Sequence, residues 1–193
     1  MTRRCDWANG TPMMAAYHDT EWGVPLYDDR KLFEFLILDA MQAGLSWEIV
    51  LNKREHFRKA FDGFDAKTIA RDRAAKVNAP LKDPGIIRKS LKINSTITNA
   101  KAFLQVQEEC GGFARYLWGF VGSRPIQHAF HRLKELPSES PASNQISKDL
   151  VRRGFRFVGP TICYAFMQAA GLVNDHLVHC FRYAELARWR PER

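Results

Sequence analysis

Segments with helix-capping residues and helical spacing of apolar side chains follow one another along most of the chain, separated by short turns. Ser46 and Asp65 stand where N-cap residues are expected, and Gly44 and Gly171 stand where helices should end. No stretch alternates apolar and polar residues as a half-buried β-strand does. The sequence therefore predicts an all-α fold, with helices near residues 29–42, 47–61, 66–71, 74–82, 88–109, 113–121, 144–153 and 160–170.

Length and composition fit a single helical domain spanning residues 1–193. Of these residues, 46% are hydrophobic and 26% are charged, which is typical of globular rather than disordered proteins. No apolar run reaches the roughly 20 residues that cross a bilayer, and the N-terminus lacks the apolar segment of a secretory signal. We therefore expect a cytoplasmic protein with no membrane partner and with reduced cysteines.

The charge of the chain points to a polyanionic partner. Lys and Arg total 29 against 21 Asp and Glu, which gives a formal net charge of +8 at pH 7. A basic surface attracts polyanions, of which nucleic acid is the commonest, although a soluble protein can also be basic without binding one. The basic pairs are spread along the chain, so folding must assemble any binding surface.

Cysteine and histidine form a pair near each end of the chain. Cys5 and His18 are thirteen residues apart, and His176 and Cys180 are four apart, so that on a helix the second pair would share one face. Together they make a Cys2His2 set, which suits structural Zn²⁺ and leaves no position for a water ligand. The alternative is two unrelated Cys/His neighbours.

Asp39 interrupts an apolar stripe on the predicted helix 29–42. Helical steps of about 100° place it between Leu36 and Ala43 on the inward side, while Glu34 and Gln42 face the other way. An inward carboxylate must be paired, hydrogen-bonded or used in function. A purely structural network is the alternative.

Residues 74–109 read as two helices joined by a tight Pro84-Gly85 turn, followed by the basic residues Arg88 and Lys89. Free backbone N–H groups at the start of the second helix would bind a phosphate. This is the pattern of a helix-hairpin-helix clamp on the DNA backbone, although many other helix hairpins use Pro-Gly.

Four aromatic residues near the N-terminus lie outside the main apolar stripes, in polar or turn contexts. Aromatic planes hold unstacked bases in proteins that act on DNA, and they also serve as ordinary core packing. The four are Trp7, Tyr17, Trp22 and Trp47.

Several long motifs, in order along nearly the whole chain, resemble the DNA-3-methyladenine glycosylase I family. They are YHDTEWGVP at 17–25, QAGLSW at 42–47, PGIIR at 84–88, RGFRFVG at 153–159 and TICYAFMQAAGLVNDH at 161–176. The resemblance implies the helix-hairpin-helix glycosylase superfamily fold, with a zinc clasp, formed by 5–18 and 176–180, that joins the two termini. The family's zinc ligands fall on Cys5, His18, His176 and Cys180.

The resemblance also implies the function and its residues. It implies a monomeric, monofunctional base excision repair enzyme that flips 3-methyladenine out of double-stranded DNA and removes it hydrolytically, leaving an abasic site. Asp39 stands where the family pattern has glutamate, and its side chain is shorter by about 1.5 Å. A bridging water or a small helix shift would restore its contact with the base. Its implied roles are base recognition and charge stabilisation. The base pocket falls on Tyr17, Trp47, Trp7 and Trp22, and the DNA contacts on Leu45, Gly85, Ile86, Ile87, Arg88 and Lys89.

Two other functions remain open from the sequence. Lys89 stands four residues after Gly85, where bifunctional members of the wider superfamily carry a Schiff-base lysine; a phosphate-binding lysine is the simpler interpretation. The aspartate at position 39 also permits a catalytically impaired, zinc-stabilised DNA-binding module. The aromatic residues argue against that module, because a backbone clamp needs no base cage.

Overall fold

The computed structural model describes residues 3–42, 44–71 and 80–189, and helices dominate them. The elements are η1 (Asp6–Asn9), α1 (Pro12–Thr20), α2 (Asp29–Gln42), α3 (Trp47–Asn52), α4 (Arg54–Ala60), η2 (Asp62–Phe64), α5 (Ala66–Arg71), α7 (Ser90–Cys110), α8 (Phe113–Gly119), β1 (Ile126–Gln127), η3 (Leu133–Glu135), α9 (Pro141–Arg152), α10 (Pro160–Ala169), β2 (Val173–Asn174) and α11 (Phe181–Ala187). In the described part of the chain, no helix is both long and apolar enough to cross a membrane.

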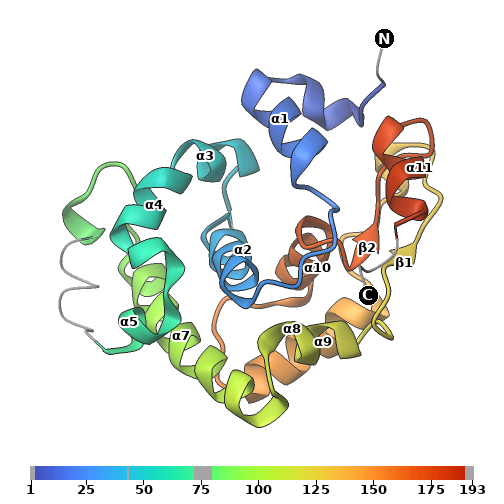
Figure 1. Cartoon of the computed structure of the whole chain (residues 1–193). Coiled ribbons are helices and arrows are strands. Elements are labelled where there is room, and N and C mark those ends of the chain that lie inside the picture. The colour runs from blue at the N-terminus through green and yellow to red at the C-terminus, as the bar shows by residue number, and fades with distance from the viewer. Residues whose placement is uncertain (1–2, 43, 72–79, 190–193) are drawn as a thin grey trace.

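Helix α2 lies at the centre of the molecule. It packs against α3, α7, α8 and α10, with α4 and α5 on one side and α1, α11 and the two strands on the other (Figure 1). All residues from Leu32 to Met41 are buried, because neighbours cover α2 on every side. Two of them, Glu34 and Asp39, are carboxylates. Glu34 was predicted to face outward; instead its side chain is buried and bonded by Arg54 and Arg58.

Most predicted helices are confirmed to within a few residues. Ser46 and Asp65 cap α3 and α5 through their side chains, which accept from Ile49 N at 3.4 Å and Thr68 N at 2.7 Å. The predicted helix 47–61 is wrong in one respect: it breaks at Lys53 into α3 and α4. The predicted helix 74–82 lies largely outside the described residues.

Several short elements escaped the sequence analysis. Thr11 caps α1 and Pro12 occupies its first turn, so the start signals of that helix were present in the sequence. The strands β1 and β2 pair in parallel, Ile126 with Val173 and Gln127 with Asn174, which corrects the expectation of no strand. Two residues are too few for an alternating pattern.

The segment after α1 docks closely onto the end of α10. Gly23 N–H donates to the Gln168 carbonyl at 3.1 Å, and Leu26 N–H donates to the Ala170 carbonyl at 3.1 Å. Gly171 has φ of +71°, and a Cβ there would lie 2.4 Å from the backbone carbon of Val24, so only glycine fits. This contact fixes α1 and its aromatic residues beside α10.

Candidate active site

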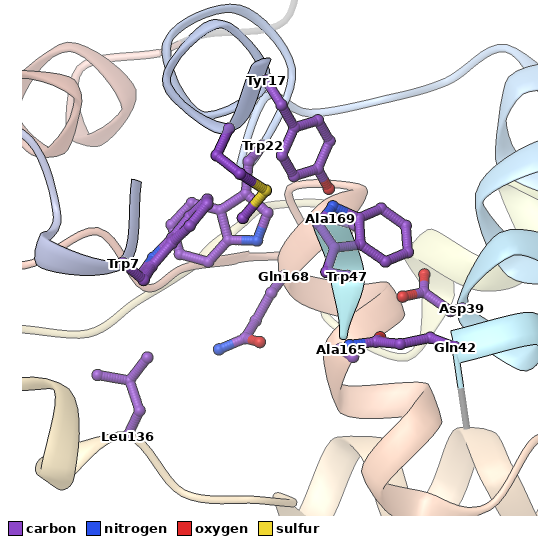
Figure 2. A pocket seen from close by; sticks show the side chains of 11 residues that line it. Trp7, Tyr17, Trp22, Asp39, Gln42, Trp47, Leu136, Ala165, Gln168 and Ala169 are labelled. Carbon is purple, nitrogen blue, oxygen red and sulfur yellow. The ribbon is translucent and has the colours of Figure 1, made fainter. Parts of the chain in front are cut away.

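A cavity of about 310 Å³ opens between α1, α2, α3 and α10. All four aromatic residues singled out in the sequence line it, and so does Asp39 (Figure 2). Ala165 and Ala169 lie one turn apart on α10, so their small side chains leave this face of the helix open. The full lining is Trp7, Met14, Tyr17, Trp22, Asp39, Gln42, Trp47, Leu136, Ala165, Gln168 and Ala169.

The aromatic walls are held by their own edge and tilted contacts. Trp7 meets Trp22 edge-on, with ring centroids 5.0 Å apart and planes at 76°. Tyr17 tilts against Trp47, with centroids 5.5 Å apart. Such contacts fix ring orientation as well as burying apolar area. Tyr17 and Trp22 are also buried core residues, so the packing role and the pocket role coincide.

Asp39 enters the cavity from α2 as a buried carboxylate. The residue is 2% exposed, and its Oδ2 has no hydrogen-bond partner among the described residues. Burial raises the pKa of the Asp39 carboxyl well above its usual range. Figure 2 shows the carboxylate directed toward the Trp47 ring, whose Nε1 is likewise buried without a hydrogen bond. The inward direction predicted for Asp39 is therefore confirmed. No hydrogen bond from a described residue ties its Oδ2 into a structural network.

Sequence analysis missed several residues of the cavity wall. Gln42 was placed on the outward face of its helix, yet it lines the cavity from the last turn of α2. Gln168 lay in a predicted buried helix and carried no charge to stand out. Met14 and Leu136 belong to segments for which no element was predicted. Helical spacing alone could not detect them, because tertiary packing brings them together.

Cys5, His18, His176 and Cys180 meet at a second buried site, as predicted. Their ligand atoms all lie within 4.8 Å of one another. Cys180 Sγ is 3.4 Å from His18 Nε2 and 3.5 Å from His176 Nδ1. Tetrahedral zinc with ordinary Zn–S and Zn–N bonds would hold sulfur and nitrogen about 3.6 Å apart. This donor set therefore fits a tetrahedral metal site.

The outer contacts of both histidines leave the inner nitrogens available as ligands. His18 Nδ1 lies 2.8 Å from Asp19 Oδ1, and Arg4 in turn binds the Asp19 carboxylate with two nitrogens. His176 Nε2 lies 3.1 Å from the Trp22 carbonyl. An acceptor beside His18 Nδ1 and beside His176 Nε2 places the proton on those nitrogens. His18 Nε2 and His176 Nδ1, which face the cysteines, therefore each present a lone pair.

One geometric expectation about this Cys/His cluster is wrong. The sequence analysis put His176 and Cys180 on one helix face, but residues 175–180 form a turn and α11 begins only at Phe181. The turn reaches back to the N-terminal segment, because Leu177 N–H points at Cys5 Sγ and Phe181 N–H donates to the Arg3 carbonyl. The cluster thus lies where the segment from Arg3 to His18 meets the turn before α11.

The hairpin turn at Pro84-Gly85 is anchored to α3 and α4. Lys53 Nζ donates to the carbonyls of Pro84 and Gly85 at 3.1 and 3.2 Å. A Cβ on Gly85 would lie 2.0 Å from His56 Nδ1, so glycine permits this close approach. Arg88 and Lys89 are exposed beside the start of α7.

Two details of the predicted phosphate clamp need correction. Helix α7 begins at Ser90 rather than Arg88, and the N–H of Gly85 is already bound by Asp83 Oδ1 at 2.7 Å. The side chains of Ile86 and Ile87 are buried, at 3% and 8% exposure, and belong to the core rather than to a surface contact. The backbone N–H of Ile86 also donates within the turn, to the Asp83 carbonyl at 3.4 Å.

The sequence of this chain matches a known protein family and known relatives. Residues 7–183 match the family model for methyladenine glycosylase. The chain is 47% identical over 180 residues to DNA-3-methyladenine glycosylase 1 of Escherichia coli (strain K12), covering 93% of this chain and 96% of that protein.

Two solved structures share the fold. A crystal structure of 3-methyladenine DNA glycosylase I superimposes with a TM-score of 0.90 at 48% identity, covering 93% of this chain and 98% of that one. A tyrosine-to-phenylalanine variant of 3-methyladenine DNA glycosylase I, in complex with 3-methyladenine, superimposes with a TM-score of 0.89 at 31% identity, covering 92% and 96%.

Proposed function

The chain belongs to the methyladenine glycosylase family, and from this membership and its cavity we infer that it is a DNA N-glycosylase that removes 3-methyladenine in base excision repair. The observation that carries the proposal is the buried Asp39 carboxylate facing an aromatic cavity, whose Oδ2 has no hydrogen-bond partner among the described residues. A DNA-binding module without chemistry would gain nothing from such a costly group.

The chemistry of the lesion explains what Asp39 does. Methylation at N3 makes the base of the nucleotide cationic. The positive charge of the methylated base would offset the cost of burying a negative carboxylate and would favour the ionised form of Asp39. An unmodified adenine is neutral and gives no such compensation. The rings of Trp47 and Tyr17 also attract an electron-poor cation. The site therefore selects charge and flatness together, and Asp39 acts as a recognising and stabilising group.

Hydrolysis then needs little acid catalysis. The N-glycosidic bond breaks, its electron pair moves onto the base, and the cationic base leaves as neutral 3-methyladenine. The sugar carbon left behind has oxocarbenium character, which the Asp39 carboxylate would stabilise at short range. Water adds to that carbon and loses a proton to solvent, leaving an abasic site.

We propose that Cys5, His18, His176 and Cys180 hold a structural Zn²⁺ as a clasp between the termini. The chemistry of the donor set, the sulfur–nitrogen distances of 3.4 to 3.6 Å and the oriented histidines support this ion. Four protein ligands leave no site for a reactive water. Trp7 packs edge-on against His18, with ring centroids 5.3 Å apart, so the clasp would also hold one wall of the cavity.

We also propose that residues 80–110 form a helix-hairpin-helix clamp and that the chain belongs to the helix-hairpin-helix glycosylase superfamily. We propose further that it binds double-stranded DNA as a monomer and acts in the cytoplasm. Exposed Arg88 and Lys89 supply charge for phosphates, while the backbone of Gly85, Ile86 and Ile87 lines the turn. Leu45, which is half-buried in the loop before α3, lies near the cavity residue Trp47 and suits contact with the duplex beside the flipped base.

The double variant Arg88→Ala/Lys89→Ala should weaken binding about equally on duplexes of different sequence. Phosphate contacts carry no base information, and each is expected to contribute about 0.9 to the slope of log affinity against log salt. Titrations at several salt concentrations should show the slope reduced by roughly 2. Lys148→Ala is a charge control away from the hairpin. A slope identical to that of the wild type in the double variant would remove this surface from the proposed DNA interface.

Product analysis tests the proposed function and its lyase alternative. The purified chain should release free 3-methyladenine from methylated duplex DNA and leave abasic sites that break only on later alkaline treatment. Borohydride added during the reaction should trap no covalent complex, because Lys89 is assigned to phosphate binding. A trapped adduct that disappears in Lys89→Ala would establish the lyase instead. Tight binding without base release would establish a DNA-binding module.

A further inference from the structure

Gln168 reaches the cavity from α10 with its amide orientation fixed. Its Nε2 donates to Asp175 Oδ2 at 2.8 Å, while the side chain lines the cavity. An amide has donors only on its nitrogen and lone pairs only on its oxygen, so binding Asp175 through Nε2 leaves Oε1 for another direction. Figure 2 shows the amide extending into the space framed by Trp7, Trp22 and Leu136.

Asp175 holds that orientation because three donors converge on it. Its side chain is 0% exposed. Oδ2 accepts from Tyr164 Oη at 2.6 Å as well as from Gln168, and Oδ1 lies 2.6 Å from His128 Nδ1. The β1–β2 pairing supplies this geometry, since His128 and Asp175 each follow one of the paired strands. A flipped Gln168 amide would turn its oxygen toward the carboxylate, acceptor against acceptor, so the flip is disfavoured.

We propose that Gln168 is a specificity-determining residue whose Oε1 accepts a hydrogen bond from the 6-amino group of the lesion, and that Asp175 is the positioning residue that keeps Oε1 facing the base. This inference rests on the proposed function and explains a selection that charge recognition alone does not make. 3-Methyladenine and 3-methylguanine nucleotides are both flat and cationic, so charge recognition treats them alike. Adenine carries a donor at position 6 and guanine an acceptor, and a fixed acceptor separates them.

The test compares the release of both bases from one methylated duplex preparation that carries 3-methyladenine and 3-methylguanine. Gln168→Met keeps the side-chain length but removes the amide. We expect the kcat/KM ratio of 3-methyladenine to 3-methylguanine to fall about tenfold or more, since a lost polar contact on one substrate and relieved repulsion on the other both act on it. Asp175→Asn should lower the ratio similarly, because an amide at 175 tolerates the flipped Gln168.

A double variant and a matched control separate positioning from general stability. If Asp175 acts through Gln168, then Asp175→Asn should add nothing further to the ratio in a Gln168→Met background. Gln107 also donates to a carboxylate, Asp29 Oδ2 at 2.6 Å, but does not line the cavity. Gln107→Met should therefore leave the ratio unchanged.

The outcomes distinguish this inference from the proposed function. Gln168→Met decides the question even if Asp175→Asn fails to fold, because Asp175 keeps its bonds from Tyr164 and His128 in that variant. An unchanged ratio in Gln168→Met, with 3-methyladenine still released, would overturn the role of Gln168 and leave the proposed function intact. Release of neither base by the wild-type chain would overturn both.

Discussion

Asp39→Asn should lower the single-turnover rate of 3-methyladenine release about tenfold to a hundredfold, which corresponds to roughly 1.5–3 kcal/mol for one charge-assisted hydrogen bond. The amide has nearly the same shape as the carboxylate but carries no negative charge to complement the cationic base or the developing charge on the sugar. Quantifying the free base by chromatography after a single turnover measures this directly. Normal release by Asp39→Asn would reduce Asp39 to a structural carboxylate.

The same substitution should not destabilise the empty protein. The pKa of Asp39 is raised by burial, so its folded-state pKa lies above the unfolded value. Such a carboxyl destabilises the fold progressively as pH rises from the unfolded pKa to the folded pKa, and that cost is fully present above both. Asparagine does not ionise, so at pH above both values the unfolding temperature of Asp39→Asn should match or exceed that of the wild type. A lower unfolding temperature would mean that the carboxylate stabilises the fold.

Asp39→Glu tests whether the short side chain limits the reaction. Glutamate adds about 1.5 Å of reach in a cavity of about 310 Å³. If the Asp39 carboxylate stops short of direct contact with the base, the variant should release 3-methyladenine at a comparable or higher rate. If the cavity is packed around aspartate, the longer side chain should lower stability by about 1–3 kcal/mol, visible in thermal unfolding.

Cys180→Ala should lower zinc content and thermal stability together. Binding free energies of structural zinc are about 10–16 kcal/mol, comparable to the whole stability of a domain, so loss of one ligand should lower the unfolding temperature by on the order of 10 °C or more. Elemental analysis and thermal unfolding on the same sample measure both quantities. A Cys180→Ala protein that lacks metal but keeps wild-type stability would contradict the structural role.

Cys163→Ala provides the matched control for that experiment. Cys163 is equally buried, but its Sγ–H donates to the Val158 carbonyl, at 3.2 Å, and it lies outside the Cys/His cluster. Burial raises its pKa to about 12, as expected for an inert thiol. The control should lose the modest stability of a truncated core side chain and keep its zinc. A chelator should then destabilise wild type and Cys163→Ala, but have little effect on Cys180→Ala.

The sequence predicted those parts of the site that carry a chemical contradiction or a distinctive residue type. Asp39 stood out because charge on an apolar stripe needs an explanation, and the structure buries its Oδ2 without a hydrogen bond from any described residue. Cysteine and histidine are rare enough that two pairs at the chain ends predicted one cluster, which the structure confirms. Helix caps such as Ser46 and Asp65 fixed helix starts because they act locally.

The rest depends on tertiary contacts that local patterns do not encode. Gln168 is neutral and helical, and the turn from α10 into β2 brings Asp175 back to it. Lys53 breaks a helix that the sequence pattern predicts to be continuous, and its side chain reaches the hairpin carbonyls of Pro84 and Gly85. Ile86 and Ile87 match a DNA-contacting motif, but their apolar side chains pack inward. A motif thus located the right turn without saying which atoms face the ligand.

Base release by the wild-type chain is the decisive measurement, made under single-turnover conditions on two duplexes that differ only in one 3-methyladenine. We predict first-order release of free 3-methyladenine from the lesion duplex and no adenine from the matched duplex, because only the cationic base compensates Asp39 and leaves as a neutral molecule. Equal binding of the two duplexes with no base released from either would contradict the assignment of the cavity as a glycosylase site.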